Sequence, residues 1–101
     1  MKAIITTLFF LLSLNIAFAE SKMEIGFDVY NNKAMCGTCH ALQAAGSEGD
    51  IGPNLDQLKP LKLQIVTAVK NGIGVMQAWE GILTYEEIEA VAYYVFNSTN
   101  K

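Results

Sequence analysis

The chain has 101 residues, 51% of them hydrophobic, and its 7 basic side chains against 10 acidic ones give a formal net charge of −3. This balance argues against nucleic acid as a partner, because phosphate binding needs clustered cations and no basic run is present. A chain of this length forms one small domain with a limited core, and such domains usually need a staple such as a disulfide, a metal or a cofactor.

Residues 1–19 have the pattern of a cleaved secretory signal peptide. A short positive start precedes an apolar run over residues 3–18, and Ala17-Phe18-Ala19 is an A-x-A-like cleavage site. An uncut membrane anchor is the alternative, but the run is short for a bilayer span and contains polar side chains. We therefore predict an exported domain of residues 20–101 in the oxidising periplasm, with a net charge of −4 once Lys2 is removed. Membrane contact is expected only if the segment stays uncut.

A short helix is predicted to lead into the most distinctive motif of the chain. Apolar residues within 25–30 recur at helical spacing, and Asn31-Asn32 ends that pattern. Cys36-Gly37-Thr38-Cys39-His40 follows, and it is the attachment motif of a c-type haem. Its two-residue spacer puts both thiols on one turn of chain, where they can add to the haem vinyl groups, and the imidazole becomes the proximal iron ligand. The sequence therefore predicts haem c, bound covalently by Cys36 and Cys39, with its iron held by His40.

Three other interpretations of the two cysteines explain the motif less well. A thioredoxin-like pair needs a strand–helix–strand context, whereas the apolar positions here have helical spacing. A structural zinc site needs four ligands, and the chain has 2 cysteines and 1 histidine. A structural disulfide accounts for neither the adjacent histidine nor the spacing of the thiols.

The middle of the chain is predicted to be a loop and then a helix. Residues 44–52 are small, polar and glycine-containing, and Gly52-Pro53-Asn54-Leu55 then forms a rigid turn. Lys59-Pro60 is expected to open a helix with proline at its first position, and Asn71-Gly72 to end it. The apolar stripe of this helix comprises Leu61, Ile65, Val66 and Val69.

The last part of the chain is predicted to be an ordered loop over residues 73–83 and a final helix. Thr84-Tyr85-Glu86-Glu87 fits a capping box, with threonine at the cap and glutamate three residues later. Ile88, Val91, Ala92 and Val95 then share one helix face, and the helix frays from Asn97. The fold class is therefore all-α, with helices joined by loops and no convincing strand.

Met76 is the candidate for the second axial ligand of the iron. No other histidine exists, Met35 abuts Cys36 and is tied to the proximal side, and Met23 lies near the mature N-terminus. Met76 lies in a glycine-containing loop, where Gly72 and Gly74 would let the backbone approach the porphyrin. A methionine that only fills the core is the alternative, since thioethers pack well in most surroundings. Beside a haem motif with no rival ligand, we expect Met76 to bind the iron, and iron is the only metal expected.

The motifs together resemble a known family. Cys36-Gly37-Thr38-Cys39-His40, Gly52-Pro53-Asn54-Leu55, the Met76 loop and the Thr84 capping box occur in the order found in small bacterial class I c-type cytochromes. The resemblance spans about residues 25–97. It implies a small cytochrome c fold of three to five helices wrapped around one covalently bound haem.

The resemblance also implies roles for single residues. The Pro53 carbonyl would accept a hydrogen bond from the proximal imidazole, and Gly26 and Phe27 would pack against last-helix residues such as Tyr93 or Tyr94. The family often has proline directly after the ligand methionine, where this chain has Gln77. That departure predicts a softer distal loop.

The function expected from these features is electron transfer rather than catalysis. No Ser/His/Asp set, phosphate loop or pair of catalytic carboxylates can be assembled, so we expect a periplasmic single-haem carrier with redox-protein partners and no small-molecule substrate. A haem subunit or dedicated acceptor of a larger periplasmic dehydrogenase is one alternative, and a ligand-binding sensor is another. Uncharged segments beside the cysteines and Met76 are expected to form the docking patch, and acidic residues around them to favour a basic partner.

Overall fold

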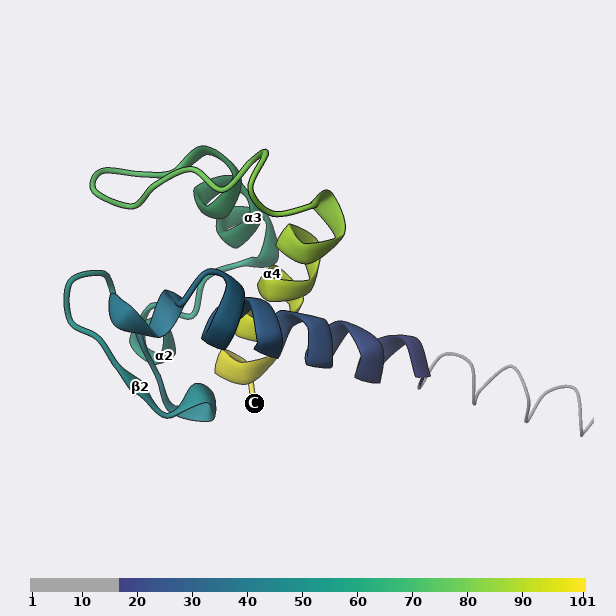
Figure 1. Cartoon of the computed structure of the whole chain (residues 1–101). Coiled ribbons are helices and arrows are strands. Elements are labelled where there is room, and N and C mark those ends of the chain that lie inside the picture. Colours follow the sequence, from purple (N-terminus) through teal and green to yellow (C-terminus); the bar gives the residue numbers. More distant parts are fainter. Residues whose placement is uncertain (1–16) are drawn as a thin grey trace, which may run out of the picture.

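The computed structural model describes residues 17–101, so residues 1–16 of the predicted signal peptide lie outside the described range. An N-terminal helix covers residues 17–28 of that range and passes directly into a π-helical turn. The remaining elements follow in chain order (Figure 1): η1 (Val29–Lys33), η2 (Cys36–Thr38), β1 (Ala41–Leu42), η3 (Gln43–Ala45), β2 (Ser47–Glu48), α2 (Leu55–Leu58), α3 (Lys62–Asn71) and α4 (Tyr85–Thr99).

The N-terminal helix crosses α4 at a glycine. A Cβ atom on Gly26 would lie 2.2 Å from the Ala90 carbonyl oxygen and 2.5 Å from Tyr94 Cβ, so only glycine lets the two backbones approach this closely. Phe27 meets the Tyr94 ring edge to face, with ring centroids 5.8 Å apart. The predicted packing of Gly26 and Phe27 on the last helix is therefore confirmed for Tyr94. Tyr93 points elsewhere.

The core lies where the N-terminal helix, α3 and α4 meet. Val29 and Tyr30 contribute from the first segment, and Ile65 and Val69 from α3. The core face of α4 is the widest, and its buried hydrophobic residues are Ile88, Ala90, Val91, Ala92, Tyr94 and Val95. This width exceeds the predicted stripe because α4 packs on both α3 and the turn η1. The predicted all-α fold class is thus correct, and burial of these apolar faces is its main stabilising term.

The capping of α4 is as predicted, whereas α3 begins later than predicted. Thr84 Oγ1 accepts a hydrogen bond from Glu87 N, and Glu87 Oε1 accepts one from Thr84 N. Helix α3 begins at Lys62, with Leu61 as its N-cap, so Pro60 precedes the helix instead of opening it. Leu61 is consequently 63% exposed and lies outside the apolar stripe, which Ile65, Val66 and Val69 form.

Two short elements were not predicted. A two-residue antiparallel pair joins the segment before the expected loop to the loop itself, and in it β1 Ala41 faces β2 Glu48 and Leu42 faces Ser47. Gly46 closes the connection with φ +67, a left-handed conformation that glycine adopts without steric cost. Helix α2 follows the predicted turn, and the Asn54 side chain caps it by accepting from Asp56 N and Gln57 N. Both elements are too short to leave a periodic pattern in the sequence.

The loops gather at one side of the molecule. Figure 1 shows the segment after β2 in teal and the segment between α3 and α4 in green extending in the same direction, beyond the end of the N-terminal helix that leads to the cysteines. Among the helices within residues 17–101, none combines the length and the apolar character needed to cross a bilayer.

Candidate haem site

The two cysteines lie on a single tight turn. Met35 precedes it in the left-handed conformation, with φ +49, and reverses the chain after η1. The Cys36 carbonyl then accepts hydrogen bonds from Cys39 N (3.1 Å) and His40 N (3.0 Å). Both cysteines are free thiols and half-buried. The turn therefore presents two sulfurs and an imidazole from adjacent positions, as the spacing predicts.

The His40 ring is held by a backbone carbonyl. Its Nδ1 lies 2.7 Å from the Pro53 carbonyl oxygen. A carbonyl can only accept, so Nδ1 carries the proton, and in a neutral ring the lone pair is then on Nε2. Nε2 is the nitrogen that a metal would bind, and such a contact fixes the tautomer and the orientation of a ligating imidazole.

Glycines let the following loop pack flat against the motif. A Cβ on Gly52 would lie 2.5 Å from His40 Cε1, and one on Gly49 would lie 2.6 Å from the Cys39 carbonyl carbon. Gly52 N also donates to the Cys39 carbonyl at 2.7 Å. The loop is thereby fixed on the cysteine turn, which brings Pro53 to His40.

The Tyr30 hydroxyl links the haem motif to the following loop, a role that the sequence does not predict. It is fully buried, and its hydroxyl lies 2.9 Å from Ser47 Oγ and 3.3 Å from the His40 carbonyl oxygen. Burial raises its pKa to about 12, because the charged phenolate would lose its hydration. Tyr30 was predicted only as an apolar position of the first helix. The partners of its hydroxyl lie outside that helix, and helical periodicity does not predict which residues they are.

The loop that carries Met76 is ordered by its own backbone. Ile73 and Met76 form a two-way bridge, with N···O distances of 3.1 Å and 2.9 Å, around the positive-φ residue Gly74. Gly72 admits this turn, since a Cβ there would lie 2.7 Å from the Met76 carbonyl oxygen. Val75 is 91% exposed, whereas Met76 is half-buried and packs against the core cluster. The loop thus turns the Met76 side chain inward and its neighbours outward.

The alternatives for the cysteine pair find little support in the structure. Burial raises the pKa of the Cys36 thiol to about 11, whereas a thioredoxin-like pair needs a thiol with a lowered pKa. In the described part of the chain the only paired strands are two residues long, so a thioredoxin-like sheet is absent from it. Within residues 17–101 no three His, Cys, Asp or Glu side chains come together as a metal-binding group.

Comparison with known proteins agrees with this geometry. Residues 21–95 match the family described as cytochrome C oxidase, cbb3-type, subunit III. Cytochrome c6 of Bryopsis maxima is 37% identical over 87 residues, which cover 78% of this chain and 94% of that relative. The crystal structure of the c-type cytochrome SorU from Sinorhizobium meliloti superposes with a TM-score of 0.76 at 46% identity, covering 81% of this chain and 95% of that one.

The chain belongs to the class I c-type cytochromes. It is a c-type haem electron carrier, and the haem c of this family is covalently bound and contains iron. The predicted recognition and the predicted small cytochrome c fold are both confirmed.

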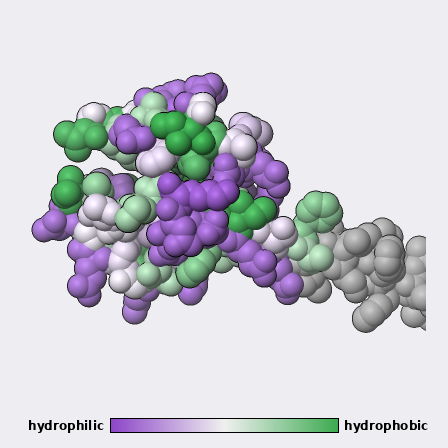
Figure 2. All heavy atoms as spheres, viewed as in Figure 1, coloured by the Kyte–Doolittle hydropathy of each residue, from purple (hydrophilic) through white to green (hydrophobic). Residues whose placement is uncertain are grey.

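The residues of this cytochrome suit a c-type haem. Two free thiols, a fixed imidazole with an available Nε2 and an inward-turned thioether supply the attachment points and the donors. Figure 2 shows the surface hollowed between two lobes, with hydrophobic side chains on both lips. The loops on either side carry exposed apolar residues, Ile51 (65%) on one and Ile73 (70%) on the other. A porphyrin in this hollow would be shielded by such side chains.

The structure brings four of the five predicted site residues together directly. Cys36, Cys39, His40 and Pro53 belong to two segments joined by hydrogen bonds. Met76 lies on the segment between α3 and α4, which extends in the same direction as the loop after β2 in Figure 1. The roles of these residues in attachment and ligation stay predictions.

Proposed function

We propose that this cytochrome carries one haem c, with iron ligated by His40 and Met76, and passes single electrons between redox proteins in the periplasm. The observation that carries the proposal is the hydrogen bond from His40 Nδ1 to the Pro53 carbonyl, which leaves Nε2 free for iron. A histidine that only packed in the core would not need a backbone carbonyl from another segment to fix its tautomer.

The residues of the chain have separate tasks in this proposal. When bound, haem c supplies the one-electron couple of its iron. The Pro53 carbonyl orients the imidazole and increases its electron density. A Met76 thioether ligand would favour the reduced form and raise the potential. The loops exclude water from the ring, and neither axial ligand acts as an acid, a base or a nucleophile.

Met76 is favoured over the other methionines by its burial and its loop. Met35 is 62% exposed and adjoins Cys36, and Met23 packs at the other end of the N-terminal helix. In the Met76→Ala variant we expect the haem to stay attached, the potential to fall, and the red absorption band of sulfur–ferric iron ligation to disappear. Carbon monoxide should then bind the reduced protein. Met35→Ala is the matched control and should keep the band, whereas an unchanged Met76→Ala spectrum would refute the ligation.

The same experiment separates the carrier from a sensor. A ligand-binding haem protein has a labile sixth position, so wild type would bind carbon monoxide rapidly and lack the sulfur–iron band. A saturated sixth position in wild type, opened only by Met76→Ala, supports electron transfer.

A haem subunit of a larger oxidoreductase is a second candidate. The matched family is described as a subunit of an oxidase, which favours it. The chain nevertheless covers almost the whole length of the c6 and SorU relatives, so it resembles complete small cytochromes, which supports a free carrier. Gel filtration of the native protein from its source cells distinguishes the two, because a subunit elutes with a catalytic protein and a carrier elutes alone.

The number of haems and the cellular location follow from one mass measurement. A single attachment motif supports one haem per chain, and the segment before residue 20 supports export. The exported protein should have the mass of residues 20–101 plus one haem. A mass that includes residues 1–19 would instead support a retained anchor.

Docking is proposed to use the uncharged surface beside the site. Met35 and Val75 are exposed there, and Glu48 and Asp50 lie on a neighbouring loop. A small apolar patch with acidic surroundings suits a brief encounter with a basic partner. The rate of electron exchange with a basic redox protein should therefore fall as ionic strength rises. A rate independent of salt would leave the apolar patch as the only docking feature.

A further inference from the structure

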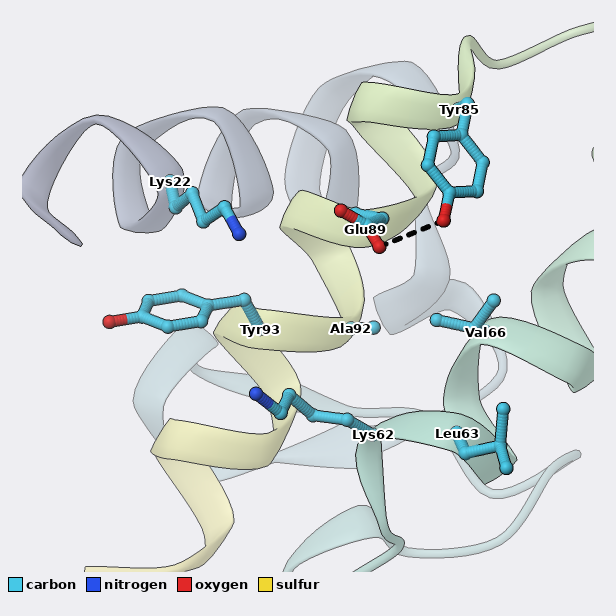
Figure 3. A pocket seen from close by; sticks show the side chains of 8 residues that line it. All are labelled: Lys22, Lys62, Leu63, Val66, Tyr85, Glu89, Ala92 and Tyr93. Carbon is cyan, nitrogen blue, oxygen red and sulfur yellow. Dashed lines mark hydrogen bonds between the residues drawn. The ribbon is translucent and has the colours of Figure 1, made fainter. Parts of the chain in front are cut away.

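A second concave site lies away from the haem motif. It has a volume of about 280 Å³ and is bounded by the N-terminal helix, α3 and α4 (Figure 3). Its lining residues are Lys22, Lys62, Leu63, Val66, Tyr85, Glu89, Ala92 and Tyr93. Ligand sites for larger organic molecules start near 300 Å³, so this cavity suits a small ligand.

Two lysines line this cavity beside the Tyr93 ring. Lys22 Nζ lies 5.6 Å and Lys62 Nζ 5.9 Å from the centre of the Tyr93 ring. Figure 3 shows one lysine from each side of the ring, with both ammonium groups toward the cavity. Lys62 is also the first residue of α3, whose N-cap Leu61 has no side-chain acceptor, so the positive end of that helix adds to the field.

Neither lysine is neutralised by a carboxylate. Within residues 17–101 the only ion pair is Lys33–Glu87, although the protein is acidic and Glu89 lines the same cavity. Glu89 Oε1 instead accepts a hydrogen bond from the Tyr85 hydroxyl at 3.0 Å, and Figure 3 shows Glu89 between Lys22 and Tyr85. Both ammonium groups thus contact one aromatic ring and line one cavity, and an anion bound in that cavity would be attracted by both.

The other lining residues indicate the polarity and the charge of the ligand. Leu63, Val66 and Ala92 give an apolar side, and Figure 3 shows these residues opposite the two ammonium groups. With two cations and one carboxylate, the cavity favours a single negative charge over several. We propose that it binds a small monocarboxylate, with the carboxylate between Lys22 and Lys62 and an apolar body against Leu63 and Val66.

This site is separate from electron transfer. Lys22 lies on the helix that ends before the cysteine turn, and the eleven residue steps from Lys22 to Lys33 alone extend roughly 16 Å. A carboxylate here would join the first turns of the N-terminal helix to α3 without reaching the haem hollow. Its binding would therefore stabilise the crossing of the helices and leave the haem spectrum unchanged.

Titration of the ¹⁵N-labelled, reduced holoprotein with benzoate tests the proposal. We expect saturable amide shifts confined to the cavity residues, with a Kd of about 1–10 mM for so small and open a site. Lys22→Gln and Lys62→Gln should each weaken binding about threefold to tenfold, and the double variant should abolish it. Glu89→Gln should tighten binding by about twofold, because it removes a like charge.

Matched controls distinguish specific binding from a general effect of charge. Lys70→Gln changes the net charge equally at the other end of α3 and should bind benzoate like wild type. Benzyl alcohol, a neutral ligand of similar shape, and inorganic phosphate should both bind more weakly than benzoate. Equal loss in Lys70→Gln, equal binding of benzyl alcohol, tighter binding of phosphate, or shifts that do not saturate would each overturn the proposal. All variants should keep the wild-type haem spectrum, which confirms that they fold.

Discussion

The helical half and the loop half of this cytochrome are built on different principles. In the helical half, the N-terminal helix, α3 and α4 bury one another, and side chains such as Val91 and Val95 are almost fully enclosed by protein. In the loop half, residues 34–54 and 72–83 form short turns with positive φ values and leave large apolar side chains exposed. The first half is stabilised by packing and the second by backbone hydrogen bonds, and we expect the second half to depend on the haem as well.

This contrast explains where function is located. Loops that lack a core of their own adopt one shape only when something else determines it. Here glycines press residues 49–53 onto the cysteine turn, and the bridge between Ile73 and Met76 sets the other loop. The helices fix the ends of both loops.

The strongest test of this contrast removes the haem attachment. The double variant Cys36→Ala, Cys39→Ala should yield little stable holoprotein, because the loop half would lose its covalent link to the ring. Circular dichroism and the haem content of the purified protein measure this. If the double variant folded without haem to the same helical content as wild type, the loop half would not depend on the porphyrin and the contrast would be wrong.

The helical half should be most sensitive to substitution at Gly26, where the backbones of the N-terminal helix and α4 lie closest together. Gly26→Ala places a Cβ 2.2 Å from the Ala90 carbonyl oxygen, which belongs to a helix backbone and cannot move aside cheaply. We expect a loss of about 3 kcal/mol or more in the free energy of unfolding. Ser21→Ala, at an exposed position of the same helix, should change little. A denaturant midpoint for Gly26→Ala within error of the Ser21→Ala midpoint would mean that the crossing is looser than the structure has it.

The two halves also differ in how well the sequence predicts them. The capping box at Thr84 and the stop at Gly72 each depend on neighbours in sequence, and both are found as predicted. The single turn expected for the two cysteines is also present, and its role in haem attachment stays a prediction. The hairpin of β1 and β2 and the short helix α2 were missed because they depend on contacts with the cysteine turn and with α4.

The candidate site shows the same division. Cys36, Cys39 and His40 follow from spacing alone, whereas the Pro53 contact came only from a family resemblance. The Tyr30 hydroxyl has two partners that are distant in sequence, so no local pattern could reveal its role. The lysine cavity combines three helices and has no motif at all.

Gly52→Ala tests the loop half without replacing a proposed ligand. Gly52 has no positive φ, so alanine fits the backbone, but its Cβ would lie 2.5 Å from His40 Cε1. The imidazole must shift, which weakens its bond to Pro53 and should cost about 1–3 kcal/mol. The reduction potential and the visible spectrum should shift as well. Gly46→Ala is the control, since it strains a positive φ in open space and should lower stability by about 1 kcal/mol while leaving the potential unchanged.

The smallest expected effect concerns Tyr30, where the two halves meet. Its pKa is about 12 in the folded protein against an ordinary 10, so the unfolded chain loses this proton first as pH rises. The stability that the neutral phenol contributes is complete below pH 10 and is lost toward pH 12, at no more than about 1.4 kcal/mol per pH unit. Tyr30→Phe should lower the free energy of unfolding by about 1 kcal/mol at neutral pH, because Ser47 and the His40 carbonyl lose a partner.

The pH dependence distinguishes titration of Tyr30 from loss of its hydrogen bonds. Tyr30→Phe should lose stability less steeply than wild type between pH 10 and pH 12, since it has no phenol to ionise at this position. Ser47→Ala removes one hydrogen-bond partner but keeps the buried phenol. Its free energy of unfolding should therefore be lower than that of wild type at neutral pH and should fall as steeply as that of wild type between pH 10 and pH 12. Urea unfolding followed by circular dichroism across this range measures all three proteins. Equal slopes for wild type and Tyr30→Phe would show that the alkaline loss of stability arises elsewhere, and that Tyr30 joins the halves through its hydrogen bonds and packing alone.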